Sequence, residues 1–252
     1  PSFNLTFWLS KLISVCLVVI CLMLIGMAVT IVKQLASGFN DIDISQYLIS
    51  LLYFNALQVC LLVVLAFFCQ IISPNKYIGM MIFVGYFFAS MVFSELGLEH
   101  NMLNYGEAPY LQYSDMNGYG WFMITQHWFM LYWTAFAIVL SIIGYGLWHR
   151  GQAQSLRSRL SLLSYNMRFY GRVVLGIAMS IFIASGSVIY YNTIIINDFK
   201  TSSELTDLRV SYEKKYSQFE NDELPTVTKV NINLDMYPEQ RKLTAKAELT
   251  IE

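Results

Sequence analysis

The sequence predicts a mainly α-helical polytopic membrane protein with five transmembrane helices and its N-terminus inside, followed by an outer helix and the first β-hairpin of a truncated β-domain. Only 13% of the 252 residues are charged, whereas a soluble domain carries about 25%. Five apolar segments have the length that a bilayer requires. The charged residues gather near the end, with 14 in residues 1–196 and 19 in residues 197–252. A membrane part is therefore joined to a small water-soluble part.

The five predicted spans are separated by polar or charged segments. A helix needs about 20 mostly apolar residues to cross the hydrocarbon core, and each segment has roughly that length. Tryptophans stand at both ends of the fourth segment, as is common at membrane interfaces. The spans cover residues 12–32, 47–72, 77–93, 128–148 and 173–196.

Charged residues outside the spans predict the direction of the chain. Basic residues precede the first span or lie in the second and fourth connectors: Lys11, Lys76, Arg150, Arg157, Arg159, Arg168 and Arg172. The acidic residues of the membrane part lie in the other two connectors: Asp41, Asp43, Glu95, Glu99, Glu107 and Asp115. Only Lys33 departs from this separation. Because cytoplasmic loops concentrate Lys and Arg, we expect the N-terminus inside and the residues after span five outside.

Residues 151–172 have the pattern of an interfacial helix rather than a span. Apolar residues recur at steps of three and four, which defines one helix face, and arginines flank it. The apolar face is Leu156, Leu160, Leu163, Met167 and Tyr170, and the arginines are Arg157, Arg159, Arg168 and Arg172. We expect this basic helix to lie on the anionic inner leaflet, either as a general surface contact or as a specific lipid site.

Span five, residues 173–196, carries a stripe of small residues. Gly176, Ser180 and Ala184 follow one another at steps of four, a spacing that lets helix backbones approach closely. The stripe predicts that this span packs against partner helices.

The connector over residues 95–120 is long, aromatic and acidic. Loops of this length usually carry a function or their own structure, and non-helical backbone at membrane depth must be surrounded by protein or line a water cavity. We therefore expect a re-entrant loop that caps a cavity between spans. Its candidate gate residues are Glu99, His100, Tyr105, Tyr113 and Asp115.

A metal or proton site at Glu99, His100 and Asp115 is a sharper hypothesis for the same loop, but their spacing is not diagnostic of metal ligands. In span two, Asn55 and Gln58 lie one turn apart. These amides are candidates for lining a polar path, although such side chains more often join neighbouring helices. The four cysteines lie in apolar runs without a CxxC spacing, which favours membrane packing over metal binding.

The outer segment divides into a helical linker, residues 197–224, and a β-hairpin in residues 225–252. Thr201 and Glu204 have the spacing of a capping box, and apolar residues then recur at helical steps to about Glu220. Two runs around a turn at 238–240 alternate with period two, which predicts a hairpin with one buried face. A lone hairpin is marginal in water. Because the chain also starts without Met, we expect it to be a piece of a longer protein.

Residues 1–150 resemble the second part of a membrane half of the type-two ABC exporter permeases. The resemblance consists of the topology and the loop length. In that family, short re-entrant helices lie outside between the fifth and sixth spans of a half. Predicted spans one to four would match that family's third to sixth spans, and 95–120 would hold the re-entrant helices. This resemblance implies a cytoplasmic ABC ATPase subunit as partner and either a second permease half or another copy of the chain.

The stretch NLDMYPEQRKLTAKAELTI is similar to the opening hairpin of the aminopeptidase N-like domain in bacterial proteins that fuse such a domain to an ABC permease. YSDMNGYG, residues 113–120, and LYW, residues 131–133, are also similar to that fused family. This resemblance implies a bacterial inner membrane protein. The zinc-binding HExxH of the family is absent from these residues, so no catalytic residue or cofactor is assigned here, and zinc is expected only if an intact peptidase domain follows.

Three functions remain open from the sequence. The first is a permease subunit of an ABC-type exporter that carries an outward-facing aminopeptidase-like domain, with ATP hydrolysed by a partner because no P-loop GxxxxGK[ST] occurs. The second is a membrane-anchored zinc aminopeptidase whose spans are only a scaffold. The third is a polytopic sensor or assembly protein with a non-catalytic outer domain. The net charge of -1 gives no sign of nucleic-acid binding.

Overall fold

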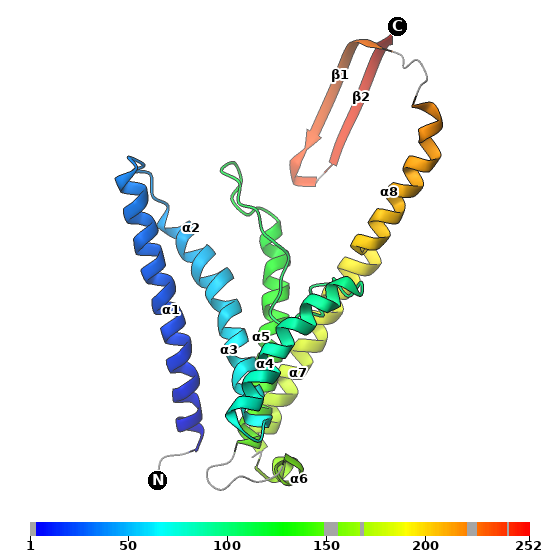
Figure 1. Cartoon of the computed structure of the whole chain (residues 1–252). Helices are drawn as coiled ribbons and strands as arrows, with labels where there is room; N and C mark the ends of the chain where they lie inside the picture. Colours follow the sequence, from blue (N-terminus) through cyan, green and yellow to red (C-terminus); the bar gives the residue numbers. More distant parts are fainter. Residues whose placement is uncertain (1–3, 149–155, 167–168, 221–225, 241) are drawn as a thin grey trace. The chain divides into compact units, whose positions relative to one another are not determined.

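The computed structural model describes residues 4–148, 156–166, 169–220, 226–240 and 242–252. The chain divides into two compact units, Pro1–Ser202 and Ser203–Glu252. The first unit is helical, and the second holds a helix and a two-stranded antiparallel sheet. Figure 1 labels these elements along the chain.

Among the described residues, five helical segments of the first unit are long and apolar enough to cross a membrane, which confirms the predicted number. They are α1 (Asn4–Ala36), α2 to α3 (Ile44–Leu48 and Leu57–Ile72, joined by a π-helix at Ile49–Ala56), α4 (Lys76–Glu95), α5 (Phe122–Leu147), and α7 (Phe169–Tyr190) with a π-helix at Tyr191–Ile196. Between α5 and α7 lies the shorter α6 (Leu156–Asn166).

Several helices are longer than the predicted spans. α1 begins at Asn4 instead of residue 12, and α5 begins at Phe122 instead of residue 128. Hydropathy marks only the part of a helix that is apolar, whereas the backbone hydrogen bonds continue through flanking polar residues. The predicted interfacial segment 151–172 also divides, because Phe169–Arg172 begin α7. Arg150, Met167 and Arg168 lie outside the described residues.

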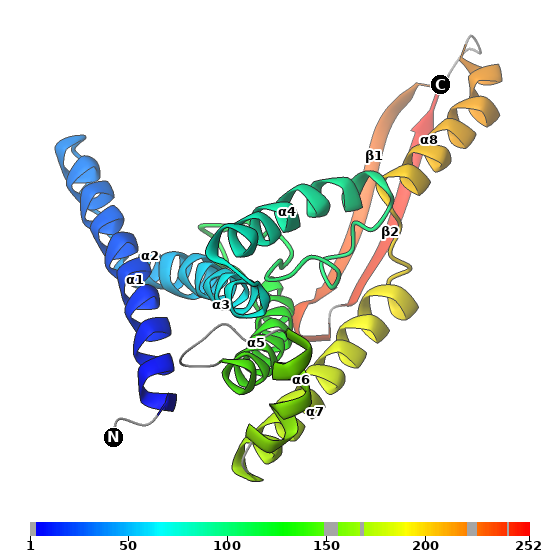
Figure 2. The same ribbon diagram turned by 60° about the horizontal axis from the view of Figure 1, so that its bottom comes forward.

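α5 is the central helix of the first unit. It packs against α3 on one side and α7 on another, while α4 and α1 pack against α3, and Figure 2 shows this arrangement along the bundle. The main core consists of buried residues from α3, α5, α7 and the connector between α4 and α5: Leu61, Tyr105, Phe129, Tyr132, Trp133, Ala137, Leu140 and Ile189. A second core joins Trp8, Ile71 and Leu147 near the first turns of α1.

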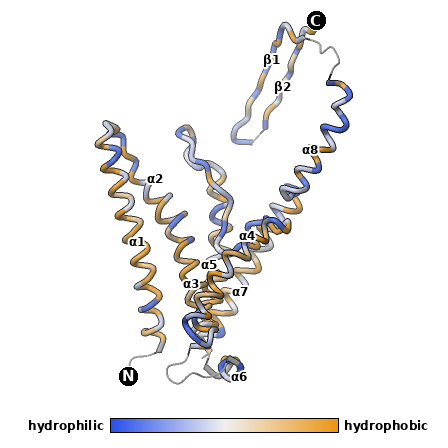
Figure 3. The backbone as a smooth tube through the Cα atoms, in the orientation of Figure 1, coloured by the Kyte–Doolittle hydropathy of each residue, from blue (hydrophilic) through white to orange (hydrophobic). Residues whose placement is uncertain are grey.

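Much of the apolar surface in the first unit is exposed. Along α1, Leu22, Ile25, Val29 and Val32 each expose more than half of their surface, and Figure 3 shows the same apolar character along the helices. Soluble proteins rarely expose contiguous apolar surface on this scale. The exposure is what lipid-facing helices require.

The two ends of the helical unit carry different charges. The first turns of α1 and the helix α6 lie at one end, and the connection from α1 to α2 lies at the other (Figure 1). Lys11, Arg157 and Arg159 belong to the first end, whereas Asp41 and Asp43 belong to the opposite one. The fold therefore keeps the separation of charges on which the predicted orientation depends.

The second unit contains most of α8 (Ser202–Tyr216), a short 3-10 helix (Ser217–Phe219), and strands β1 (Val227–Tyr237) and β2 (Lys242–Ile251). α8 ends before the predicted Glu220 because the last turn tightens into the 3-10 form. The predicted hairpin is confirmed. Val230 pairs with Leu249 and Ile232 with Ala247, which places apolar side chains on one face. The expected burial of that face is absent, because every described strand residue is exposed.

Candidate functional site

The connector between α4 and α5 enters the helical core at Tyr105. This side chain is only 7% exposed, and its hydroxyl donates a hydrogen bond to the Leu61 carbonyl at 3.0 Å. The ring packs edge-on against Trp133 and Phe136 of α5. Leu61 lies near the middle of the apolar segment Ile44–Ile72. Residues 100–108, here called the inserted segment, therefore reach the middle of the bundle at Tyr105.

Side chains from two helices satisfy the backbone of the inserted segment. The Trp133 indole donates to the Glu107 carbonyl at 2.7 Å, and the Tyr86 hydroxyl donates to the Tyr105 carbonyl at 3.3 Å. Non-helical backbone at this depth must find such partners, since an unsatisfied polar group in hydrocarbon costs several kcal/mol. Gly106 has a positive φ of 82°, a conformation that favours glycine and that turns the chain directly after Tyr105.

His100 connects the inserted segment to the end of α7 and its π-helical extension. The Met102 backbone N–H donates to Nδ1 at 3.2 Å, and Nε2 lies 3.0 Å from the Thr193 hydroxyl. That hydroxyl itself donates to the Ile189 carbonyl. This network requires the neutral ring with its proton on Nε2. Burial lowers the pKa of His100 and favours the same neutral form.

Glu99 fixes the start of the inserted segment by a second contact. Its carboxylate accepts hydrogen bonds from the Ser202 hydroxyl at 2.7 Å and the Ser202 backbone N–H at 2.9 Å. These bonds hold the pKa of the Glu99 carboxyl below its ordinary value. His100 thus attaches the connector to the end of the fifth apolar helix, and Glu99 attaches it to Ser202 beyond that helix.

Tyr113 and Asp115 lie in a different part of the connector. Ser114 and Gly118 form an antiparallel bridge, so residues 113–119 make a tight turn whose tip, Met116, is 97% exposed. Tyr113 packs against Tyr119. Of the five predicted gate residues, only Glu99, His100 and Tyr105 join the bundle, while Tyr113 and Asp115 belong to this exposed turn.

The predicted three-residue metal or proton site does not assemble. Glu99 is bonded to Ser202, His100 to Thr193, and Asp115 lies in the exposed turn. Within the described part of the chain, no group of three or more His, Cys, Asp or Glu side chains is placed to hold a metal ion.

A pocket of about 250 Å³ lies between α3, α4 and the inserted segment. Gln58 lines it together with Tyr86, Ser90 and Glu107, so one of the two predicted path-lining residues faces a cavity. Asn55 does not line this pocket, and its amide donates to the Ser50 carbonyl at 2.7 Å. This local bond belongs to the π-helical turn between α2 and α3.

Gly176, Ser180 and Ala184 all lie on an exposed face of α7. The face that packs against α5 contains Ala178, Ser185, Gly186 and Ile189 instead. A Cβ added at Gly186 would lie 3.0 Å from Tyr132, whereas one at Gly176 would meet nothing within 4 Å. The predicted stripe is thus available to another helix but has no partner in the described part of this chain.

Sequence reasoning missed several residues that position the inserted segment. Trp133, Thr193 and Ser202 supply its partners, and none of them carries a signal in a single sequence. Asn104 is 4% exposed, and its Oδ1 has no hydrogen-bond partner among the described residues. The sequence shows that Asn104 is polar, but it gives no sign that this side chain is buried.

Comparison with known proteins gives no relative for this chain: no family model, no curated protein and no solved structure matches it.

Proposed function

We propose that this chain is the membrane permease part of an ABC-type exporter and that its inserted segment is the gate on the outer side. The observation that carries the proposal is the bond from Tyr105 to Leu61. A connector that served only to join two helices would remain at the surface. Here it occupies the middle of the bundle and contacts helices α3, α4, α5 and the end of α7.

The orientation places the N-terminus and α6 in the cytoplasm of a bacterium and residues 95–120 outside its inner membrane. The separation of Lys and Arg from Asp and Glu supports it. In the same orientation, the hairpin of β1 and β2 lies outside. Its uncovered apolar face fits the first strands of a larger sheet, in line with the resemblance to an aminopeptidase N-like domain.

The mechanism that we propose is alternating access. A cytoplasmic ATPase subunit hydrolyses ATP, and the helices rock with a second permease half or a second copy of the chain. In the described state the inserted segment closes the outer side. To open it, Tyr105 must leave Leu61 and Trp133 must release the Glu107 carbonyl. The pocket at Gln58 lies directly beside the inserted segment and makes Gln58 a better path-lining candidate than Asn55.

A reversible crosslink tests the gate. A Cβ at Gly106 would lie 3.9 Å from the Leu61 Cβ, which is within the distance that a disulfide spans. The full-length protein carrying Gly106→Cys and Leu61→Cys, copurified with its ATPase and reconstituted, should lose most of its ATP turnover on oxidation and regain it on reduction. Each single variant is the control for strain at Gly106, where φ is positive.

Two results would contradict the proposal. If no ATPase copurifies and purified protein stimulates no ATP turnover, the permease has no energy source, and a membrane-anchored peptidase or a sensor becomes the better account. If the crosslink forms completely and ATP turnover is unchanged, the inserted segment is a fixed structural element and not a gate.

A further inference from the structure

The end of the bundle opposite the inserted segment contains a second polar pocket. It has a volume of about 250 Å³ and lies where α1, α3 and α6 meet. Two cations line it, Lys11 and Arg159, together with Gln70 and the indoles of Trp8 and Trp148. We call it the basic pocket. It shares no residue with the proposed gate.

No carboxylate of this chain can neutralise the two cations from the surrounding helices. Residues 1–40, 44–94 and 116–197 contain neither Asp nor Glu, and these ranges include all of α1, α3, α5, α6 and α7. Two positive charges line one pocket while the helices around it carry no carboxylate, and this combination favours an anionic ligand.

Two further groups of the basic pocket are prepared for such a ligand. The Arg159 guanidinium is held in place by a 2.7 Å hydrogen bond from Nη1 to the Ile71 carbonyl. Trp8 is 6% exposed, yet its indole Nε1 has no hydrogen-bond partner among the described residues. A buried N–H of this kind requires an acceptor, and the oxygen of an anion in the pocket would supply one.

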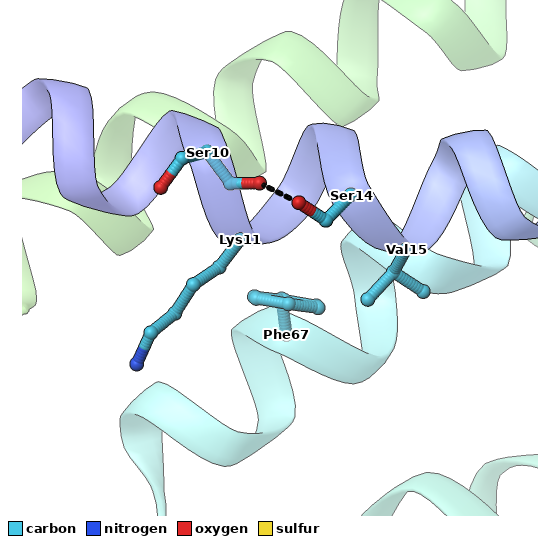
Figure 4. A pocket seen from close by; sticks show the side chains of 5 residues that line it. All are labelled: Ser10, Lys11, Ser14, Val15 and Phe67. Carbon is cyan, nitrogen blue, oxygen red and sulfur yellow. Dashed lines mark hydrogen bonds between the residues drawn. The ribbon is translucent and has the colours of Figure 1, made fainter.

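Beside the basic pocket lies a second hollow, here called the groove, which shares Lys11 and Phe67 with it. The groove has a volume of about 390 Å³ and is lined by Ser10, Lys11, Ser14, Val15 and Phe67. Figure 4 shows Lys11 extending past Phe67 at one end of this hollow and Val15 at the other. The groove thus runs from a charged end along α1, and it suits a ligand with an anionic head and a hydrocarbon chain.

We propose that the basic pocket binds the phosphate group of an anionic phospholipid, with its acyl chain in the groove beside Val15 and Phe67. Lys11 and Arg159 pair with the phosphate oxygens, and Trp8 donates its indole N–H. The lipid would add a further contact among α1, α3 and α6, beside the packing of Trp8 on Ile71 and the bond from Arg159 to the Ile71 carbonyl. This site is independent of the transport function proposed above.

The test measures binding of phosphatidylglycerol to the purified full-length protein in nanodiscs of phosphatidylcholine. Lys11→Gln and Arg159→Gln should each weaken binding about tenfold, which corresponds to the loss of one charge-assisted hydrogen bond. Arg157→Gln is the matched control, because Arg157 lies on the same helix, is exposed and does not line the pocket. Arg157→Gln therefore removes one positive charge from α6, as Arg159→Gln does, without changing the basic pocket.

The outcomes are distinct. Equal losses for Arg157→Gln and Arg159→Gln would show a general attraction to an anionic surface and overturn the site. Protection from thermal unfolding by inorganic phosphate alone, equal to that by the lipid, would identify a free phosphate as the ligand and overturn the lipid. Arg159→Gln also removes the bond to Ile71. Arg159→Lys, which keeps the positive charge, must therefore weaken binding less than Arg159→Gln. Lys11→Gln must weaken binding while its unfolding in neutral detergent without lipid stays unchanged.

Discussion

The Tyr105 hydroxyl donates to the Leu61 carbonyl across 3.0 Å, joining a connector to the middle of a helix that lies 44 positions earlier in the chain. This bond and the packing of the Tyr105 ring against Trp133 place non-helical backbone inside an apolar bundle.

Tyr105→Phe removes the hydroxyl and leaves the ring in place. We expect a loss of about 1 kcal/mol in the free energy of unfolding, the usual net contribution of one buried hydrogen bond. Thermal unfolding of the purified protein in detergent measures it. Tyr110→Phe is the control, because Tyr110 is 92% exposed. Equal effects of the two substitutions would contradict the buried position of Tyr105.

Glu99→Gln weakens the contact between the connector and Ser202. The pKa of Glu99 is lower in the folded protein than its ordinary value of 4.5, so the stabilisation is present at neutral pH and is lost as the pH falls through the folded pKa. At pH 7 the Ser202 amide should exchange with deuterium faster in the variant than in the wild type. In acid below the folded pKa, this difference should disappear. Asp115→Asn, in the exposed turn, should leave the exchange rate of the Ser202 amide unchanged at both pH values.

His100 predicts a second pH dependence at a higher pH. Its pKa is lowered by burial from an ordinary value of 6.5, so the unfolded chain binds the proton more readily and stability falls as the pH drops through 6.5. Protonation of Nδ1 would also replace the acceptor for the Met102 N–H with a donor. The melting temperature should be lower at pH 5.5 than at pH 7.5. The difference in melting temperature between the two pH values should be smaller in His100→Gln than in the wild type. In His127→Gln it should be as large as in the wild type.

Gly186→Val should destabilise the contact between α5 and α7. A Cβ at this position would lie 3.0 Å from Tyr132, and overpacking of this kind costs about 1–3 kcal/mol. Gly176→Val, on the same helix, has open space around it and should leave unfolding of the isolated chain unchanged. Reduced self-association of Gly176→Val would support the predicted role of the Gly176, Ser180 and Ala184 stripe in partner contacts.

The sequence predicted the number of apolar helices and the hairpin because both depend on local patterns. Hydropathy over about 20 residues marks a span, and the alternation around residues 238–240 fixes a hairpin register that pairs Val230 with Leu249. Each of these signals is contained within one continuous stretch of chain.

The other features of the fold and of the candidate site depend on which helices are neighbours, and a single sequence does not show this. Gly176 and Gly186 both stand among small residues of α7, and only the position of Tyr132 decides which of them is packed. Similarly, nothing near His100 in the sequence indicates Thr193 as its partner. Glu99, His100 and Asp115 formed one cluster of candidates in the sequence, and the fold assigns them to three different environments.

The most direct test of the account is the side of the membrane on which each end of the bundle lies. In the full-length protein with its native cysteines replaced by alanine, Ser114→Cys and Ser158→Cys are exposed to an impermeant thiol reagent in intact cells. The account predicts that Ser114→Cys is labelled at once and that Ser158→Cys is labelled only after the membrane is permeabilised. Labelling of Ser158→Cys in intact cells, or equal labelling of both positions, would contradict the orientation and with it the outer gate.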